Sequence, residues 1–317
     1  MPRAEPPPDA ASLRQQLTES TVRALWTQWR AIGGSASTAH RATSIVDPEA
    51  LVLASLFFGD HEPRLRDLLD AWVERNSALL SIRRLRALAP TYAPVVADRL
   101  RDFAPVAQQL AKHPRWAVLA ASDGPKSKSA LHRPEVARAV APDLTVPPAL
   151  MLRLRTAFGV GVKADALTYL LGQSARGSGA GATVRAIAEA TRYTLVATRR
   201  AVEDLTASKL VLMYDERPVT FSVAAEPWEH LLALKPLPAW HSWHSIFAFT
   251  SGFVAWADRA AAKPPSTTVL SVRIRDLLVA HPAVRRLVVN ALESNGPDTR
   301  TDARTITTVA NWIDRAA

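Results

Sequence analysis

The chain has 317 residues, of which 48% are hydrophobic, a formal net charge of +10 and no cysteine. This length and apolar content exclude a largely disordered chain and indicate two or three folded units. The lack of cysteine excludes disulfides, cysteine nucleophiles and thiolate metal sites, and it fits a cytoplasmic protein. The positive charge indicates an anionic partner, most commonly nucleic acid, although an Arg-rich and Ala-rich composition contributes to it.

Neither a secretory signal nor a membrane span is expected. Residues 1–11 are rich in proline and contain no basic stretch followed by an apolar run. The most apolar stretch, from Trp243 to Ala257, carries His244 and Ser251 and is too short to cross a bilayer. We therefore expect a soluble protein with no membrane partner.

The N-terminal third is predicted to be helical. After a disordered tail over residues 1–12, apolar residues from Val22 to Ile32 recur every three or four positions, the spacing of one helix face. Asp47 followed by Pro48 is typical of the start of a helix. Later prolines divide the next residues into further helices. We expect a helical domain over residues 13–122 and a linker over residues 123–146.

The central region, residues 147–225, changes from helical to β-type patterns. A first helix is expected around Ala164 to Leu171, followed by a Gly-rich and Ser-rich flexible loop. A second helix is expected from Thr183 to Ala190, followed by a turn of Thr191, Arg192 and Tyr193. A third helix follows, and its inner stripe is Thr198, Ala201, Val202 and Leu205. Two β-type runs come next, Leu210 to Tyr214 and Val219 to Val223, joined by residues 215–218. Residues 226–317 return to helical patterns and are expected to form a C-terminal helical domain.

Three stretches of this central region, residues 158–171, 183–190 and 194–211, resemble the winged helix-turn-helix transcription regulators of bacteria, such as the MarR and ArsR superfamily. The likeness covers about a quarter of the chain. It implies that the third helix enters the DNA major groove and that the hairpin wing lies along the backbone or the minor groove. The predicted fold is therefore mainly α, with a central winged helix-turn-helix and a small β-hairpin wing flanked by helical domains.

The residue pattern of the third helix supports DNA contact independently of the resemblance. Thr194 is a good N-cap, and the outward positions of the helix are Leu195, Val196, Arg199 and Arg200. Arginine can bond guanine bidentately or clamp phosphate, and aliphatic groups can meet thymine methyls. The remaining candidate contacts, to flanking phosphates or from the wing, are Arg185, Arg192, Tyr193 and Arg217.

Two features depart from the family pattern. The turn position usually occupied by glycine is Arg192, so the turn either has a conformation that arginine tolerates or carries strain. The predicted wing tip carries Asp215 and Glu216 beside the single Arg217, and these carboxylates repel phosphate.

Other function classes have weaker support. His241 and His244 lie three apart and could bind a metal with a third ligand, but Trp240 and Trp243 interleave with them and favour an aromatic packing surface. The Gly-rich loop before Thr183 lacks the Gly-Lys-Ser/Thr ending of a phosphate-binding loop. We therefore predict no metal, no cofactor and no catalytic residues.

The predicted function is sequence-selective binding of double-stranded DNA by a bacterial transcription regulator. A homodimer is expected because two recognition helices must lie about 34 Å apart on a two-fold site. The aromatic stretch from Trp240 to Trp256 could be an ordinary core, a dimer interface or an effector pocket, so a small-molecule or protein effector stays open. The alternative is a protein-interaction module, an antitoxin or assembly factor, that uses the winged helix and this aromatic region.

Overall fold

A computed structural model describes residues 9–35, 40–119, 139–175, 181–293 and 301–317. These residues are mainly α-helical, as predicted, and the sheet found among them is one two-stranded antiparallel hairpin. The elements are α1 Ala10–Ala31, α2 Pro48–Phe58, α3 Arg64–Asn76, η1 Ser77–Leu79, α4 Ile82–Leu88, η2 Ala89–Thr91, α5 Val95–Ala111, η3 Pro114–Val118, η4 Pro147–Ala149, α6 Leu150–Phe158, α7 Val162–Ser174, α8 Val184–Thr191, α9 Leu195–Ala207, β1 Leu212–Tyr214, β2 Thr220–Ser222, α10 Ala225–Leu232, α11 Trp243–Ala260, α12 Thr267–Ala280, α13 Pro282–Glu293 and α14 Thr301–Ala316.

Capping residues explain where the first two helices begin. Asp47 accepts a hydrogen bond from the backbone N–H of Ala50, and Pro48 occupies the first turn of α2, as predicted. Asp9 accepts a hydrogen bond from the N–H of Ser12 and caps α1 in the same way. Helix α1 therefore begins at Ala10, so residues 10–12, which we expected in the disordered tail, belong to this helix. Residues 1–8 lie outside the described part of the chain.

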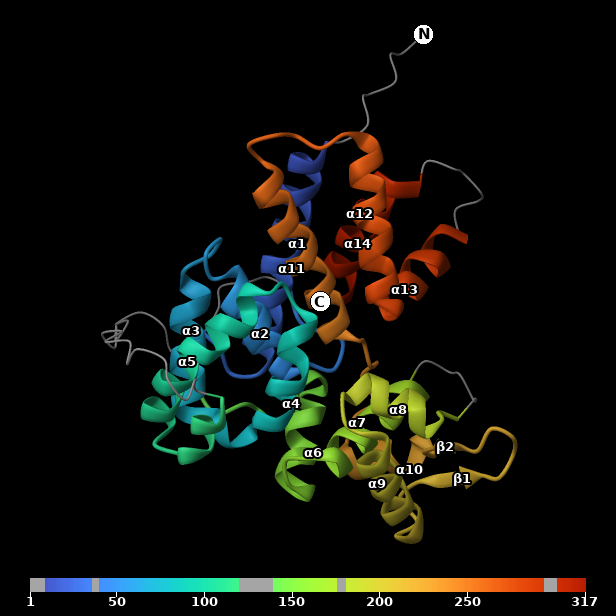
Figure 1. Cartoon of the computed structure of the whole chain (residues 1–317). Helices are drawn as coiled ribbons and strands as arrows, with labels where there is room; N and C mark the ends of the chain where they lie inside the picture. The colour runs from blue at the N-terminus through green and yellow to red at the C-terminus, as the bar shows by residue number, and fades with distance from the viewer. Residues whose placement is uncertain (1–8, 36–39, 120–138, 176–180, 294–300) are drawn as a thin grey trace.

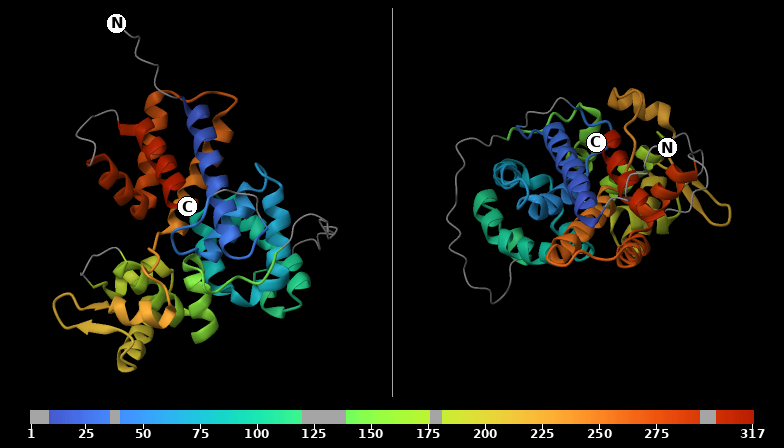
Figure 2. Two further views of the ribbon diagram at one scale, coloured as in Figure 1. Left: turned by 180° about the vertical axis from the view of Figure 1, so that it is seen from behind. Right: turned by 90° about the horizontal axis from the view of Figure 1, so that it is seen from above.

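Helices from both ends of the chain form one body, which we call the helical body and define as α1–α5 with α11–α14. Their buried apolar side chains belong to a single core, with Trp29 and Trp72 from the N-terminal part and Phe253 and Ile313 from the C-terminal part. Figures 1 and 2 show α1 lying beside α11 and α14. The Ser20 hydroxyl donates to Asp314 over 2.9 Å across this contact. The helices after residue 242 therefore share a core with the N-terminal helices and do not form the separate C-terminal domain that we expected.

Residues 147–240 form a second unit, the central unit, with its own core. Leu167 and Leu170 of α7, Ile187 of α8 and Val202 of α9 pack there with Phe221 of β2. The same core includes Trp228, Leu232, Leu237 and Trp240. The central unit thus extends to Trp240, beyond the expected boundary at residue 225. Figure 1 shows it at one end of the helical body.

The two units meet through backbone hydrogen bonds and one close approach. The N–H of Ile45 donates to the carbonyl oxygen of Ala239 over 3.0 Å, and the N–H of Val46 donates to that of Pro148 over 3.0 Å. A Cβ atom at Gly172 of α7 would lie 2.7 Å from Cδ1 of Ile45, which precedes α2, and 2.6 Å from the Cβ of Trp240, so this close approach requires glycine. Of the expected linker 123–146, residues 123–138 lie outside the described part of the chain. The expected flexible loop is described except for residues 176–180.

Candidate nucleic-acid interface

Helices α8 and α9 are both fixed at their N-termini by threonine caps. The Thr183 hydroxyl oxygen accepts a hydrogen bond from the N–H of Ala186, and the Thr194 hydroxyl oxygen accepts one from the N–H of Ala197. Each cap satisfies a backbone donor that the first turn of a helix leaves free. Helix α9 therefore starts at the residue after Thr194, which sets which side chains its first turn presents.

The α8–α9 turn, formed by Arg192 and Tyr193, reverses the chain through a left-handed residue. Arg192 has φ 60° and ψ 35°, and its N–H donates to the carbonyl oxygen of Ala188 over 2.8 Å. An L-residue with a Cβ atom is strained in this region, where glycine is favoured. Arginine thus occupies a position that favours glycine. Of the two possibilities stated for this turn, a conformation that arginine tolerates or backbone strain, the structure has backbone strain.

The outer face of α9 is exposed, and its inner face is buried. Thr198, Ala201, Val202 and Leu205 are buried, as the predicted inner stripe requires. On the outer side Leu195 is 50% and Val196 is 68% exposed. Arg199 and Arg200 are also exposed, and no hydrogen bond or ion pair holds either side chain within the described residues. The first two turns of α9 thus present two apolar groups and two unpaired cations to solvent.

Tyr193 does not have the position that we expected. Its hydroxyl donates to the Asp165 carboxylate over 3.0 Å and lies 3.4 Å from the Ser81 hydroxyl oxygen. Burial is the main reason that the pKa of this hydroxyl is raised, and the Asp165 charge adds to the effect. The hydroxyl is therefore engaged inside the protein and does not point to a flanking phosphate.

The bond from Tyr193 belongs to a buried group of ionised residues that joins the two units, which we call the charge network. It contains Asp47 and Glu49 of the α2 start, Arg84 of α4, Arg155 of α6 and Asp165 of α7, all with at most 2% exposure. Arg84 bonds Asp47 at 2.5 Å and Glu49 at 2.6 Å, and Arg155 bonds Glu49 at 2.7 Å and Asp165 at 2.8 Å. The two arginines and three carboxylates thus form one continuous chain of charge-assisted bonds.

The network also reaches the α8–α9 turn. The Nε of Arg84 donates to the carbonyl oxygen of Thr191 over 2.9 Å, and Asp165 accepts from the Tyr193 hydroxyl. Burial is the largest influence on the pKa of Asp47 and raises it, but the Arg84 guanidinium and His244 together outweigh burial and hold that pKa well below its usual range. Arg84 thereby attaches the start of the turn to α4 of the helical body, and Asp165 attaches Tyr193 to α7.

These network residues are functional candidates that sequence reasoning missed. Asp47 was interpreted only as an N-cap. Of the arginines of α4, Arg83 and Arg86 are exposed, whereas Arg84 is fully buried. The available signal was helical spacing: Arg84 lies next to the apolar Leu85 and one turn before Leu88, so it shares their inward side.

The hairpin and its neighbour form a small β structure at the edge of the central unit. Strands β1 and β2 pair with Met213 opposite Phe221. Ala182, just before α8, exchanges backbone hydrogen bonds with Phe221 at 2.8 and 2.9 Å. The hairpin tip projects from the unit (Figure 1), and Asp215, Glu216 and Arg217 are exposed there.

The remaining predicted contact, Arg185, is exposed on α8. The structure therefore brings Leu195, Val196, Arg199 and Arg200 together on one helix, while Arg217 lies on a separate element.

The histidines considered as metal ligands have other surroundings. His244 is buried, with Nδ1 3.8 Å from an oxygen of Asp47, and the His241 ring packs edge-on against Trp312. Across the ranges that the structure describes, no group of three or more His, Asp or Glu side chains is arranged to hold a metal ion. In the same ranges none of the helices combines the length and the apolar character needed to cross a membrane.

No family model, curated protein or solved structure matches the chain.

Proposed function

We propose that the chain is a winged-helix protein that binds double-stranded DNA selectively and acts as a transcription regulator in the bacterial cytoplasm. The order α7, Ala182 bridge, α8, turn, α9 and β1–β2 hairpin supports the winged-helix assignment. The observation that carries the function is the outer face of α9, where Arg199 and Arg200 are exposed and unpaired beside Leu195 and Val196.

The chemistry of this face fits the major groove. A guanidinium can donate two hydrogen bonds to the O6 and N7 of guanine or clamp a phosphate, and the methyl groups of Leu195 and Val196 suit thymine methyls. Arg185 of α8 and Arg192 of the turn are exposed and would contact flanking phosphates. The acidic groups at the hairpin tip make Arg217 a weak contributor.

A two-fold DNA site would require two copies of the chain. Recognition helices in helix-turn-helix dimers lie about 34 Å apart, one turn of DNA. We therefore propose a homodimer on DNA. The charge network would set the direction of α9 relative to the helical body in each copy, because it attaches the α8–α9 turn to α4.

The test is binding of the full chain to DNA fragments from its own gene neighbourhood at several salt concentrations. We expect a selective complex whose affinity falls steeply with salt. Replacing both arginines in R199A/R200A should lower affinity by thirty-fold or more, since each good arginine contact contributes about 1–3 kcal/mol.

The matched control is R285A/R286A, which removes two adjacent exposed arginines from α13 and changes the net charge equally. A similar loss in both double variants would mean that net charge, and not α9, carries the binding. Equal binding by wild type and R199A/R200A would refute the assignment of α9 as the recognition helix.

One observation favours a second candidate, a protein-interaction module. Leu212, Met213 and Tyr214 of β1 are all between 43 and 51% exposed, next to the acidic hairpin tip. Such an apolar strand with carboxylates beside it suits a protein surface better than phosphates. This alternative predicts no DNA complex at any salt concentration and a partner whose binding changes little with salt.

A further inference from the structure

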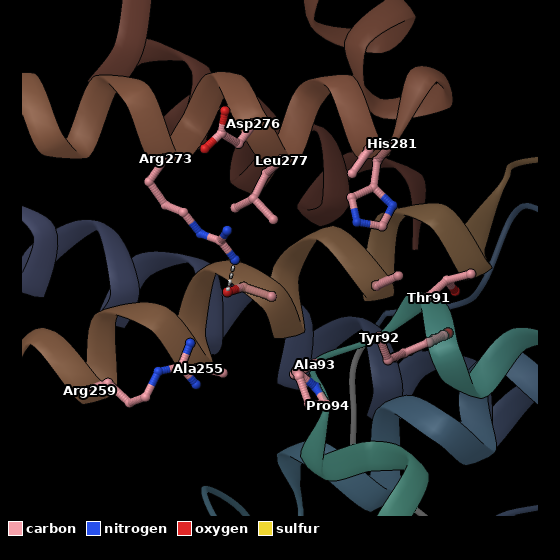
Figure 3. Close-up of a pocket in the computed structure, with 13 residues that line it drawn as sticks. Thr91, Tyr92, Ala93, Pro94, Ala255, Arg259, Arg273, Asp276, Leu277 and His281 are labelled. Carbon is pink, nitrogen blue, oxygen red and sulfur yellow. Dashed lines mark hydrogen bonds between the residues drawn. The ribbon is translucent and has the colours of Figure 1, made fainter.

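A partly open cavity of about 200 Å³ lies in the helical body. It is bounded by residues 91–94, where η2 leads into α5, and by helices α11 and α12 (Figure 3). The apolar part of its wall is made mostly by small residues, namely Ala93, Pro94, Ala248, Gly252, Ala255, Leu277 and Ala280. Pockets for drug-sized ligands are larger, about 300–1,000 Å³, so this cavity suits a body the size of a single ring.

Two arginines supply the charged side of the cavity. Figure 3 shows the Arg273 side chain extending from α12 toward α11, where one Nη donates to the carbonyl oxygen of Gly252 over 3.4 Å. The Nε of Arg273 is buried and has no hydrogen-bond partner. Arg259 of α11 lines the same cavity and makes no hydrogen bond or ion pair within the described residues. The cavity thus holds an unsatisfied donor and an unpaired cation.

Among the described residues, Asp276 is the acidic group in this cavity and only partly offsets the two cations. Asp276 lines the cavity, but no ion pair within 4.0 Å joins it to either arginine among the described residues. Burial lowers the pKa of Arg273 most, and the charge of Arg259 lowers it further, whereas Asp276 opposes this shift. A bound anion would relieve the repulsion and satisfy the Nε donor.

The opposite end of the cavity is uncharged at neutral pH. His281 is buried there, and burial is the main reason that its pKa falls to about 4, with the charges of His244, Arg192 and Arg273 adding to the effect. The neutral form of this imidazole therefore predominates at neutral pH. The cavity consequently has one cationic side and one apolar, neutral side.

We propose that this cavity binds a small organic anion, with its acidic head on Arg273 and Arg259 and its apolar body against Ala248, Ala255 and Leu277. A guanidinium binds carboxylate and phosphate in the same two-point geometry. The titration described next distinguishes a carboxylate head from a phosphate head. This inference concerns the helical body and holds whether or not the central unit binds DNA.

Calorimetric titration of the full chain with benzoate, phenyl phosphate and the uncharged benzamide tests the proposal. We expect at least one of the two anions to bind and benzamide not to bind, and the preferred anion identifies the head group. R273Q should weaken that binding tenfold or more, and A255L, which fills the cavity, should weaken it similarly.

The matched control is R275Q on the same helix, since Arg275 is exposed and does not line the cavity. It should leave affinity unchanged. If R273Q does not fold, R259Q replaces it, because the Arg259 side chain is exposed and holds no other group. The proposal fails if neither anion binds the wild type, if benzamide binds as well as the anions, or if the cavity variants bind as the control does.

Discussion

Asp70 of α3 is a carboxyl group with too few partners. One of its oxygens is buried without a hydrogen bond, and burial raises its pKa from 3.8 to about 6, although Arg66 opposes the shift. Because the folded state holds this proton more tightly than the unfolded state, the group favours folding below pH 3.8 and loses that contribution as the pH rises through 6. At pH 8 the ionised carboxylate therefore destabilises the fold.

D70N should remove this penalty at pH 8 and have little effect at pH 3, where the acid is protonated in both the folded and the unfolded state and resembles the amide. The gain at pH 8 has an upper bound of about 3 kcal/mol from the shift in pKa. Urea unfolding at the two pH values measures it, with D102N at an exposed site on α5 as the control. A D70N effect that is the same at both pH values would contradict the buried-carboxylate explanation.

At the scale of elements, the α8–α9 turn combines backbone strain with a proposed DNA contact. R192G should raise the free energy of unfolding by about 1 kcal/mol, because glycine adopts positive φ without strain. The same variant should weaken DNA binding, because it removes an exposed cation beside α9. Thermal unfolding and DNA titration of one sample separate the two effects.

The control for R192G is A233G at the end of α10, where Ala233 is exposed and has φ 51°. It should be stabilised in the same way and bind DNA as the wild type does. Stabilisation without any loss of DNA affinity in R192G would remove Arg192 from the proposed interface.

Local signals in the sequence predicted these elements well. Thr183 and Thr194 are the N-cap residues of α8 and α9, which begin at the residues that follow them. The stripe from Thr198 to Leu205 follows helical spacing and is buried, as predicted. The end of the N-terminal tail was missed because the three residues after the cap at Asp9 carry no large apolar side chain. Such signals act over three or four residues and are visible in the sequence.

Long-range contacts were not predictable in this way. Periodicity marks Trp240 and Trp243 as apolar, but Trp240 packs in the core of the central unit and Trp243 in that of the helical body. Likewise, Arg84 looks like a surface arginine until Asp47 and Glu49, more than thirty positions away, are known to surround it. Which distant partner a side chain meets depends on the tertiary fold and not on local spacing.

For the whole molecule, the charge network determines how the two units are joined. The Glu49 carboxylate accepts bonds from Arg84, from Arg155 and from the N–H of Ser81. E49Q keeps the shape but removes the charge, which leaves buried guanidinium groups without a full partner. Removing one member of a buried ion pair costs about 3–5 kcal/mol.

We expect urea unfolding of E49Q to show a loss of this size that added salt does not diminish, because buried pairs are little screened. The control E62Q breaks an ion pair between Glu62 and Arg64, whose side chain is 75% exposed, and should change stability by less than about 1 kcal/mol. Equal effects of the two substitutions would show that the network does not hold the units together.

The pairing of α1 with α14 has a consequence for synthesis of the chain. Ser20 can bond Asp314 only after another 294 residues have been synthesised, whereas the core of the central unit is complete once Trp240 has been synthesised. On the ribosome the central unit can therefore form first, while the face of α1 that packs against α14 stays uncovered until α14 leaves the exit tunnel. A ribosome that stops shortly before residue 301 would release a folded central unit joined to a body that lacks one wall of its core.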